Sequence, residues 1–386
     1  MHYDTSFCKY SRAALVINTE HIANNVRCIR KLTNPASRLM AVVKADGYGH
    51  GICQVAKAAV SAGVDCLGVA TVREGLDLRT AGIDAPVLVL SPVFEEEFEA
   101  MLQGNLACTV FNLSECEKLS QIAQKLNITA KVHIKIDTGM NRVGYSYSNT
   151  PALIREISAI SIMRYIRVDG IYSHLATSDS DAEFANEQFT RFSAVCHALI
   201  SSGVYIPVKH ISNSGAVINH PSFNLDMVRC GIILYGLAPC STPEGAKALT
   251  ELGFKPALTL KSRISHIKTI RAGESVGYGR NFFATDDTVV ASIPLGYADG
   301  ISRKLSNTGT VLVNGKVCRI IGNVCMDQLM VNVTGANAAL RGEVVFIGQD
   351  GWHTQTAEDI ASLQGTINYE VATSLSLRLP TYYTAQ

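Results

Sequence analysis

From about residue 38 onward, the chain repeats a pattern of a short apolar run, a loop and a longer amphipathic segment. A short apolar run bounded by turn residues is typical of a buried strand, and apolar residues at helical spacing indicate an amphipathic helix. Helices are expected, for example, over residues 182–200 and over residues 114–126, where one face carries Leu119, Ile122, Ala123 and Leu126. The eight runs expected to form strands cover residues 40–43, 67–72, 86–90, 108–111, 132–136, 166–172, 208–211 and 231–235.

This repeat predicts an α/β fold, with an N-terminal (β/α)8 barrel of the TIM type over residues 1–250. Eight strand and helix units in roughly 200 to 250 residues match the size of such a barrel. A doubly wound parallel sheet is the alternative, but no G-x-G-x-x-G motif follows the first strand.

The pattern changes beyond about residue 250. Strand-like runs, several of them alternating, are separated by turns that contain Ala272-Gly273, Asn314-Gly315 and Arg341-Gly342. They cover residues 258–270, 288–294, 310–313, 316–321, 328–333 and 343–347. Two helices are expected over 356–363 and 369–379, the latter ending before Pro380. Residues 251–386 are therefore predicted to form a mostly β C-terminal domain.

A lysine directly follows the first expected strand. Lys44 comes after the apolar run 40–43, and the carboxyl ends of parallel strands are where catalytic groups collect. Tyr48 and His50 are polar aromatic residues in a glycine-rich turn before a helix, a setting that suits a phosphate or another anion. These neighbours favour a Schiff base between Lys44 and a phosphorylated aldehyde cofactor, and a solvated loop lysine is the alternative.

The composition excludes several classes of protein. A net charge of +1, without a basic cluster interleaved with aromatic residues, argues against nucleic-acid binding. The first residues, MHYDTSFCKYSR, lack the apolar core of a signal peptide, and no run reaches the roughly 18 apolar residues that a membrane helix requires. The eleven cysteines form no C-x-x-C pair, which indicates buried thiols in a reducing compartment. A cytoplasmic enzyme without a metal ion or a membrane partner is expected.

Other expected strand ends also carry polar groups. They are Lys135 and Arg142 in KIDTGMNRVGY, His174 in IYSHLATSD, Asn213 and Ser214 in HISNSGAV, and Arg229 and Gly231 in MVRCGIILYG. Together they supply an amine, an imidazole, guanidiniums and groups that bind phosphate. Taken singly, His174 has the alternative of a satisfied core histidine and Arg142 that of a salt-bridge partner.

These motifs resemble those of the pyridoxal-phosphate-dependent alanine racemases, in the same order and nearly from end to end. The matching stretches are AVVKADGYGHG, KIDTGMNRVGY, HISNSGAV, MVRCGIILYG, VGYGRNFFA, IPLGYADG, GNVCMDQLMVNV and TINYE. The resemblance implies a barrel followed by a β domain, L- and D-alanine as substrates, and a head-to-tail homodimer with active sites between its subunits.

The resemblance also implies roles toward the cofactor, pyridoxal 5′-phosphate. Lys44 would hold the cofactor covalently, and Arg229 would face its pyridine nitrogen. The phosphate would be bound by Tyr48, Ser214, Gly231, Ile232 and Tyr369, and the cofactor-binding set further includes His174 and Asn213. Backbone amides suit a dianion, which requires several N–H donors.

Racemisation requires an acid–base group on each face of the cofactor, because the α proton leaves from one face and returns on the other. By resemblance, the two groups are Lys44 and Tyr278 of the partner subunit. A phenol needs about 4 kcal/mol of differential stabilisation of its phenolate to act as a base near pH 7. His174, hydrogen-bonded to Arg229, is the expected local source.

By the same resemblance, the substrate carboxylate is anchored by Arg142 and by the backbone amide of Met326, which comes with Asp327 from the partner subunit. The outer corridor to the site would be formed by Tyr297, Arg303 and Ile367. Tyr278 and Tyr369 would narrow its inner end, and two bulky phenols leave room for a methyl group more readily than for a long side chain. Alanine is therefore the expected substrate, with serine a weaker one.

Lys135 matches a position that is carbamylated in some members of the family. A carbamate would turn a cation near Arg142 into an anion that orients this arginine. An ordinary lysine in a local ion pair is the alternative.

Three other functions are alternatives to this one. They are a racemase of serine or of broader specificity on the same scaffold, a decarboxylase of basic amino acids, and a non-catalytic pyridoxal-phosphate-binding protein. The motifs around Arg142, Tyr278 and Met326 favour the alanine racemase, and a protein that only bound the cofactor would not need residues 251–386. The physiological direction, toward D-alanine for a cell wall or away from it, is left open by the sequence.

Overall fold

The computed structural model describes residues 12–375 and 377–385. Residues 1–11, on which the expected lack of a signal peptide depends, lie outside this range. The chain forms two compact units. The barrel unit is Ala23–Gly47 with Ile52–Leu234, and the β unit comprises the described residues up to Ile22, Tyr48–Gly51 and those from Tyr235 onward. The expected boundary between separate domains at residue 250 stays a prediction.

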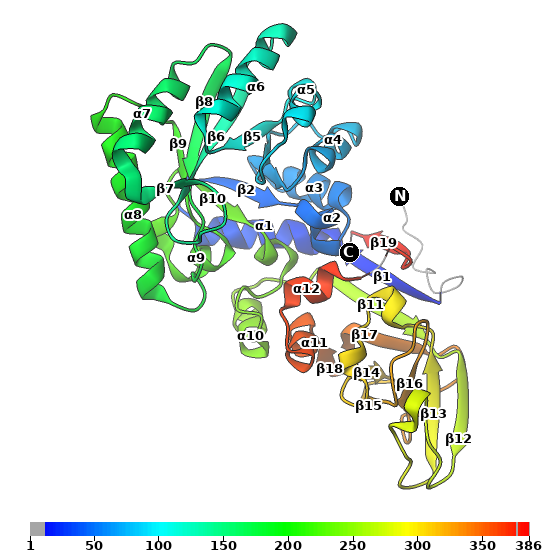
Figure 1. Cartoon of the computed structure of the whole chain (residues 1–386). Coiled ribbons are helices and arrows are strands. Elements are labelled where there is room, and N and C mark those ends of the chain that lie inside the picture. The colour runs from blue at the N-terminus through cyan, green and yellow to red at the C-terminus, as the bar shows by residue number, and fades with distance from the viewer. Residues whose placement is uncertain (1–11, 376, 386) are drawn as a thin grey trace. The chain divides into compact units, whose positions relative to one another are not determined.

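The barrel unit is built on eight parallel strands that form a nearly closed barrel (Figure 1). They are β2 (Arg38–Val42), β3 (Cys66–Val69), β4 (Val87–Val89), β5 (Ala107–Val110), β6 (Ala130–Asp137), β8 (Ile166–Tyr172), β9 (Val208–His210) and β10 (Met227–Cys230). Their order is β10-β2-β3-β4-β5-β6-β8-β9, and the short β7 (Tyr145–Ser146) pairs with β6. Two backbone hydrogen bonds link the terminal strands, from Asp226 N–H to the Lys209 carbonyl (3.1 Å) and from Arg229 N–H to the Ser212 carbonyl (3.0 Å). The predicted (β/α)8 barrel is confirmed.

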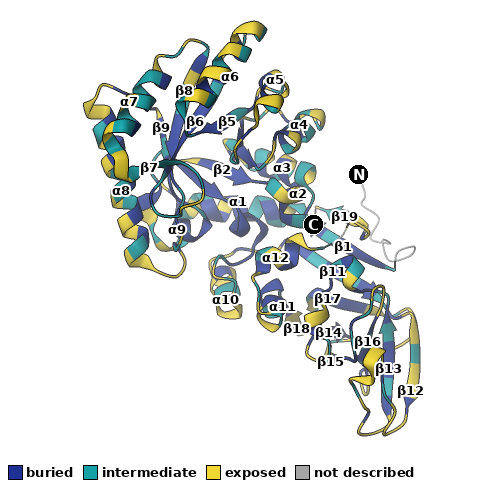
Figure 2. Cartoon of the chain, in the orientation of Figure 1, coloured by how far each residue is buried: buried dark blue, intermediate teal, exposed yellow. Residues whose placement is uncertain are grey.

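Helices cover the barrel strands on the outside, which explains why the strands are nearly continuous apolar runs. The main helices are α1 (Thr19–Leu32), α3 (Ile52–Ser61), α4 (Val72–Thr80), α5 (Phe98–Gln103), α6 (Leu113–Leu126), α7 (Thr150–Ser161), α8 (Ala182–Ser201) and α9 (Ser214–Asn219). In α6, Leu119 and Ala123 are buried on the predicted face, and Figure 2 shows the outer surface of this helix exposed. Among the described residues, no helix combines the length and the apolar character needed to cross a bilayer.

The eighth strand lies elsewhere than the sequence predicts. Residues 231–235 are not a strand, since Ile232–Tyr235 forms the 3-10 turn η5, and the strand is Met227–Cys230. Both segments are fully buried, so hydrophobicity does not distinguish them. Pairing with β2 selects the strand, and it places Arg229 beside Met40, inside the strand and not at its end.

The β unit is built on a ten-stranded, mostly antiparallel sheet, which confirms the predicted mostly β fold (Figure 1). Its strands are β1 (Ala13–Asn18), β11 (Leu258–Arg263), β12 (His266–Ile270), β13 (Thr288–Ile293), β14 (Thr310–Val313), β15 (Lys316–Ile321), β16 (Leu329–Asn332), β17 (Glu343–Asp350), β18 (His353–Gln355) and β19 (Thr381–Thr384). The single strand predicted over 258–270 is two strands, β11 and β12. The unpredicted β1 pairs with β11 and β19. The helices are α10 (Pro243–Glu251), α11 (Ala357–Gln364) and α12 (Asn368–Thr373), and α12 ends before the predicted residue 379.

The turn that follows β2 has an uncommon backbone conformation. In α2 (Lys44–Gly49), residues 45–49 all have positive φ, between 50° and 78°, so this helical turn is left-handed. A left-handed conformation costs an L residue roughly 1–2 kcal/mol, so the surroundings must hold it in place. Two hydrogen bonds contribute, from Gly47 N–H to the Val43 carbonyl (2.8 Å) and from Ile52 N–H to the Asp46 carboxylate (2.8 Å).

Glu74 connects this turn to the start of α4. One of its carboxylate oxygens accepts from Ala45 N–H (2.7 Å), and the other accepts from Ala70 N–H (2.7 Å). Glu74 also completes the capping box of α4 together with Thr71. The bond to Ala45 depends on the parallel pairing of β2 with β3, which brings the ends of the two strands together.

We expect Glu74→Ala to lower the free energy of unfolding by about 2–3 kcal/mol. Two amides lose their acceptor and α4 loses part of its cap, at roughly 1 kcal/mol each. Urea unfolding of the variant and of wild type measures the difference. Glu117→Ala, at an exposed position of α6, is the matched control and should change the value by less than about 0.5 kcal/mol. Equal stability of Glu74→Ala and wild type would show that the turn does not need this carboxylate.

Candidate active site

Five predicted site residues lie at the C-terminal ends of barrel strands. Lys44 follows β2, Arg142 follows β6, His174 follows β8, Ser214 follows β9 and Gly231 follows β10. Because the eight strands are parallel, these ends share one rim of the barrel. We call this the C-terminal rim.

Lys44 carries an amine that loses its proton more readily than a solvated lysine. Burial lowers the pKa of Lys44 below its usual range, and the positive charge of Arg142 lowers it further, while Glu74 opposes the shift. The neutral amine, which is both nucleophile and base, is therefore populated closer to neutral pH. This environment differs from that of the solvated loop lysine considered as the alternative.

Arg229 lies inside β10, but its buried side chain, with 3% of the residue's surface exposed, reaches the C-terminal rim and bonds residues at the ends of β8 and β9. Its Nη2 group donates to the carbonyls of Ser173 (2.8 Å) and Ile211 (3.1 Å) and to Nδ1 of His174 (3.2 Å). Its Nη1 group donates to Nδ1 of His210 (2.9 Å). Burial lowers the pKa of Arg229 to about 10, so the guanidinium stays charged at neutral pH. Its Nε–H has no partner among the described residues and is available to a ligand.

The hydrogen bond expected between Arg229 and His174 is thus present, and it determines which nitrogen of the His174 imidazole carries the proton. Because arginine only donates, Nδ1 of His174 must accept, and the neutral ring carries its proton on Nε2. Burial lowers the pKa of His174 well below its usual range, and Arg229 adds to the shift. His174 is therefore neutral and can donate from Nε2.

Ser214 and Gly231 meet between the ends of β9 and β10. The Gly231 N–H donates to the Ser214 hydroxyl oxygen at 3.0 Å, which leaves the hydroxyl hydrogen available for an anion. The Asn213 side chain has a different task, since its oxygen accepts from the Ala216 amide (3.0 Å) and from the Ser178 hydroxyl (2.7 Å) and so caps α9. Two of the residues predicted to bind phosphate are thereby brought together.

Lys135 lies inside the barrel, with 5% of its surface exposed. Its ammonium is 4.3 Å from the ring centroid of Tyr172, and the Arg229 guanidinium is 5.1 Å from the same ring. No carboxylate lies within ion-pair distance of Lys135 in the part of the chain that the structure describes. Burial lowers the pKa of Lys135 well below its usual range, helped by Arg229 and Arg142, which favours a neutral, reactive amine.

Arg142 is exposed at the C-terminal rim and makes no ion pair within residues 12–375 and 377–385. It lines a small cavity together with Lys135, Asp137 and His174. The alternative of a salt-bridge partner is therefore not supported by the described residues. The guanidinium is free to bind a carboxylate.

In the β unit, two of the predicted phosphate ligands lie close together. The Tyr48 ring centroid is 4.9 Å from that of Tyr235 and 6.1 Å from that of Tyr369. Burial raises the pKa of Tyr48 to about 12, so its hydroxyl stays protonated and can donate. Gly49 permits the turn that carries Tyr48 to lie close to α12, because a Cβ at this position would lie 2.3 Å from the carbonyl oxygen of Ala372 in α12.

The residues assigned to a partner subunit or to the corridor are exposed on the β unit. The exposed fractions are 75% for Tyr278, 53% for Met326, 51% for Ile367 and 43% for Tyr297. The loops that carry Tyr278, Tyr297 and Met326 are linked by hydrogen bonds, since the Asn323 side chain donates to the Tyr278 carbonyl (2.7 Å) and Tyr297 N–H donates to the Cys325 carbonyl (3.0 Å). Clustered, exposed apolar side chains are typical of an interaction surface.

The other two residues of this set belong to the same surface. Asp327 is paired with Arg378 at 2.8 Å, and Arg303 is exposed in the short turn η8 (Arg303–Leu305). Ser306, directly after this turn, accepts from Val324 N–H (3.0 Å), which attaches the turn to the loop before Asp327.

Sequence reasoning missed three side chains that shape the site: Glu74, Tyr172 and His210. The T-x-x-E spacing of residues 71–74 is a signal for Glu74, because it marks a capping box. Tyr172 and His210 end β8 and β9, and their rings stack with centroids 4.7 Å apart. Among the described residues, no group of three or more His, Cys, Asp or Glu is placed to hold a metal ion.

Two family models match the chain. Residues 17–239 match the alanine racemase N-terminal domain, and residues 257–383 match the alanine racemase C-terminal domain. The alanine racemase of Methanococcus maripaludis is 40% identical over 369 residues, which are 95% of this chain and 97% of that protein. The alanine racemase of Desulforamulus reducens is 41% identical over the same shares of both chains.

Solved structures similar to this chain belong to the same family. The alanine racemase of D-cycloserine-producing Streptomyces lavendulae superposes with a TM-score of 0.92 at 33% identity, covering 97% of this chain and 98% of that one. The alanine racemase of Clostridium difficile 630 gives a TM-score of 0.91 at 36% identity, covering 98% and 97%. The chain belongs to the alanine racemase family of isomerases.

Proposed function

We propose that the protein interconverts L-alanine and D-alanine with pyridoxal 5′-phosphate and two bases, Lys44 and Tyr278 of the partner subunit. The observation that carries the proposal is the composition of the C-terminal rim. A lysine amine of lowered pKa and a buried arginine with an unshared Nε–H occupy the same rim as the Ser214 and Gly231 pair. Relatives at about 40% identity bear the name alanine racemase.

The residues of the rim fit this cofactor. When bound, pyridoxal phosphate supplies an aldehyde that reacts with amines and a ring that takes up the electrons released when Cα loses its proton. Arg229 would donate its unshared Nε–H to the ring nitrogen, and the Ser214 hydroxyl would donate to the phosphate. Because Arg229 stays charged and only donates, it would keep the ring nitrogen unprotonated. Tyr48, Asn213, Ile232 and Tyr369 stay predicted members of the cofactor site.

The proposed acid–base work is divided between two groups. Lys44 would take a proton from one face of Cα and return one to the same face. Tyr278 of the partner subunit would act on the opposite face, and its 75% exposure in the single chain is what a residue that completes another subunit's site requires. Arg142, which has no ion-pair partner in the described chain, would bind the substrate carboxylate. Met326 and Asp327 stay predicted anchors from the partner subunit.

The proposal includes a homodimer in the cytoplasm. The exposed surface around Tyr278 and Met326 supports the homodimer, since this surface would be covered in the assembly. The cysteines of the described chain are all free thiols, as a reducing compartment allows.

A racemase assay across L-alanine, L-serine and larger L-amino acids tests the activity. We expect wild type to turn over alanine fastest, serine weakly and larger substrates negligibly. Lys44→Ala should reduce alanine turnover by about 10²- to 10⁴-fold, the usual contribution of a positioned acid–base group. Lys57→Ala, at an exposed position of α3, is the matched control and should be unaffected. Full activity of Lys44→Ala, or equal rates for all substrates, would refute the proposal.

Exchange of the α proton in deuterated water tests the division of labour. Tyr278→Phe should suppress exchange of one enantiomer, L-alanine, by about 10²-fold or more and leave exchange of D-alanine much less affected, because each base serves one face. Tyr205→Phe removes the hydroxyl of another exposed tyrosine and should change neither rate. Equal losses for both enantiomers would contradict the two-base assignment.

A mixed dimer gives an independent measurement of the shared site. Chains carrying Lys44→Ala and chains carrying Tyr278→Phe should each be inactive alone. Unfolding and refolding them together should restore activity, because one of the two sites of a mixed dimer then contains both bases. No recovery would place both groups in the same subunit's site.

We also propose that Lys135 is carbamylated, since its amine is buried, lacks a carboxylate partner among the described residues and has a lowered pKa. A neutral amine adds to carbon dioxide and releases a proton, which leaves an anion beside Arg142. After equilibration with ¹³C-bicarbonate, wild type should show a carbamate carbon signal in ¹³C NMR. Lys131→Ala should retain the signal and Lys135→Ala should lose it. A spectrum without this signal in wild type would establish an unmodified lysine.

A further inference from the structure

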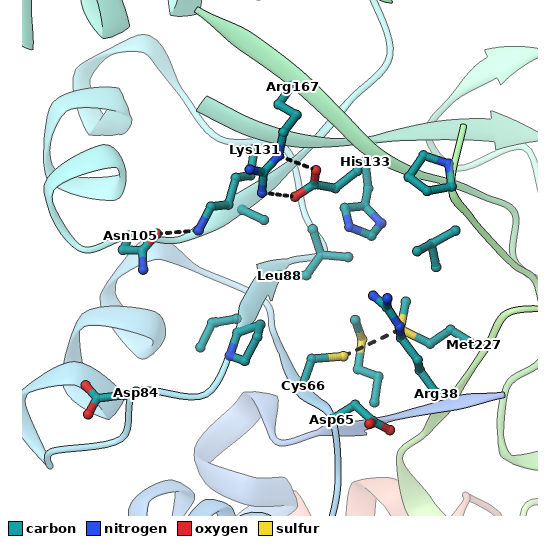
Figure 3. Close-up of a pocket in the computed structure, with 17 residues that line it drawn as sticks. Arg38, Asp65, Cys66, Asp84, Leu88, Asn105, Lys131, His133, Arg167 and Met227 are labelled. Atoms are coloured by element: carbon teal, nitrogen blue, oxygen red, sulfur yellow. Dashed lines mark hydrogen bonds and ion pairs between the residues drawn. The ribbon is translucent and has the colours of Figure 1, made fainter. Parts of the chain in front are cut away.

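The end of the barrel opposite the C-terminal rim contains a cavity of about 660 Å³ (Figure 3). All eight barrel strands contribute their first or second residue to its wall, from Arg38 of β2 to Met227 of β10. The cavity is therefore the N-terminal mouth of the barrel, and no residue predicted for the active site lines it.

One buried residue, His133 of β6, connects this mouth to the barrel interior. His133 is 8% exposed, and its ring points into the cavity, where Arg38 faces it (Figure 3). Its Nδ1 lies 2.9 Å from Nε2 of His210, and Nδ1 of His210 lies 2.9 Å from Nη1 of Arg229. Two imidazoles thus form a continuous hydrogen-bonded chain from the mouth to the guanidinium at the opposite end.

The chain crosses a strand, and a glycine makes this possible. His133 lies on β6 and His210 on β9, with β8 between them. Gly170 of β8 is the neighbour of His133 in the sheet register, and a Cβ on Gly170 would lie 2.4 Å from Nδ1 of His133. The missing side chain leaves the space through which the two imidazoles meet.

Arg229 determines the direction of every hydrogen bond in the chain. An arginine only donates, so Nδ1 of His210 accepts and neutral His210 carries its proton on Nε2. This proton is donated to Nδ1 of His133, and neutral His133 therefore carries its own proton on Nε2. Protonation of either ring would place two donors face to face and break the chain.

The surroundings keep both imidazoles neutral. Burial is the main influence and lowers the pKa of His133 to about 4, with Arg229 and Arg38 lowering it further and Asp169 opposing. Burial also lowers the pKa of His210 well below its usual range, helped by Arg229, His133 and Lys135. The ring of Tyr172 stacks on His210 and carries no charge, because burial raises its pKa. At neutral pH the chain is intact.

We propose that His133 and His210 are positioning residues that hold the Arg229 guanidinium toward the cofactor's ring nitrogen, and that their chain ends at the N-terminal mouth, where His133 donates to water or another acceptor. The inference rests on the proposed function, because it concerns the same arginine. It extends the racemase site through the whole barrel to an opening on the side away from the substrate.

Two variants interrupt the chain in different ways. His133→Leu removes the acceptor of His210, and Gly170→Ala displaces the His133 ring without changing its chemistry. His133→Gln is the conservative variant, since its amide oxygen can accept from His210. His197→Leu, at an exposed position of α8, is the matched control.

Kinetics and the absorbance of the bound cofactor test the role in the holoenzyme. His133→Leu and Gly170→Ala should each lower kcat by about 10- to 100-fold, the usual effect of removing an outer partner of a site group. The loss should be equal in both directions, with KM for alanine unchanged because Arg142 is untouched. Both variants should also shift the pH titration of the cofactor absorbance. His133→Gln should restore both properties, and His197→Leu should alter neither.

Histidine-selective ¹⁵N NMR of the holoenzyme separates this inference from the proposed function. It should show the imidazoles of His133 and His210, like that of His174, protonated at Nε2 only and unchanged from about pH 8 to about pH 6, whatever reaction the protein catalyses. A proton on Nδ1 of His210 would overturn the chain. The positioning role would be overturned if both interrupting variants kept the wild-type kcat and the wild-type pH titration of the cofactor absorbance. It would also be overturned if His133→Gln did not recover these two properties.

Discussion

The buried guanidinium of Arg229 is the group on which the interior of the barrel depends. Because arginine only donates, each neighbour must present an acceptor, and the carbonyls of Ser173 and Ile211 and the Nδ1 atoms of His174 and His210 do so. These acceptors come from the ends of β8 and β9, so a side chain of β10 ties three neighbouring strands together where the barrel closes. The same bonds set the tautomers of two imidazoles. The contacts of Arg229 that join the strands where the barrel closes therefore also set the protonation states of the site histidines.

The charge of this interior explains what the site can bind. Arg229 and Lys135 both lie against the ring of Tyr172, and no carboxylate pairs with either in the described chain. A buried charge without a counter-ion is costly, so the structure favours neutral imidazoles and a neutral or modified Lys135. It equally favours an anionic ligand, which is what a phosphorylated cofactor and a substrate carboxylate provide. The electrostatics of the barrel interior and the proposed chemistry therefore agree.

The two ends of the barrel differ in structure, since one carries a left-handed turn and the other a cavity. At the C-terminal rim, a left-handed turn held by Glu74 carries Lys44, and such a costly conformation limits the positions that the amine can take. At the N-terminal end, the first residues of the strands leave a cavity into which His133 points. The hydrogen-bonded chain of His133, His210 and Arg229 between the two ends requires the space beside Gly170, which a side chain at this position of β8 would fill.

The sequence by itself determined the fold class and much of the rim, because these depend on local properties. The alternation of apolar runs gave the barrel, and motifs directly after strands located Lys44, Arg142, His174 and Ser214. The tertiary structure decided what depends on pairing between distant strands. It selected Met227–Cys230 over an equally buried neighbour as the eighth strand, joined Glu74 to the turn after β2, and brought His133 into line with His210 and Arg229. No local pattern contains such contacts, because they exist only once β6, β9 and β10 face a common interior.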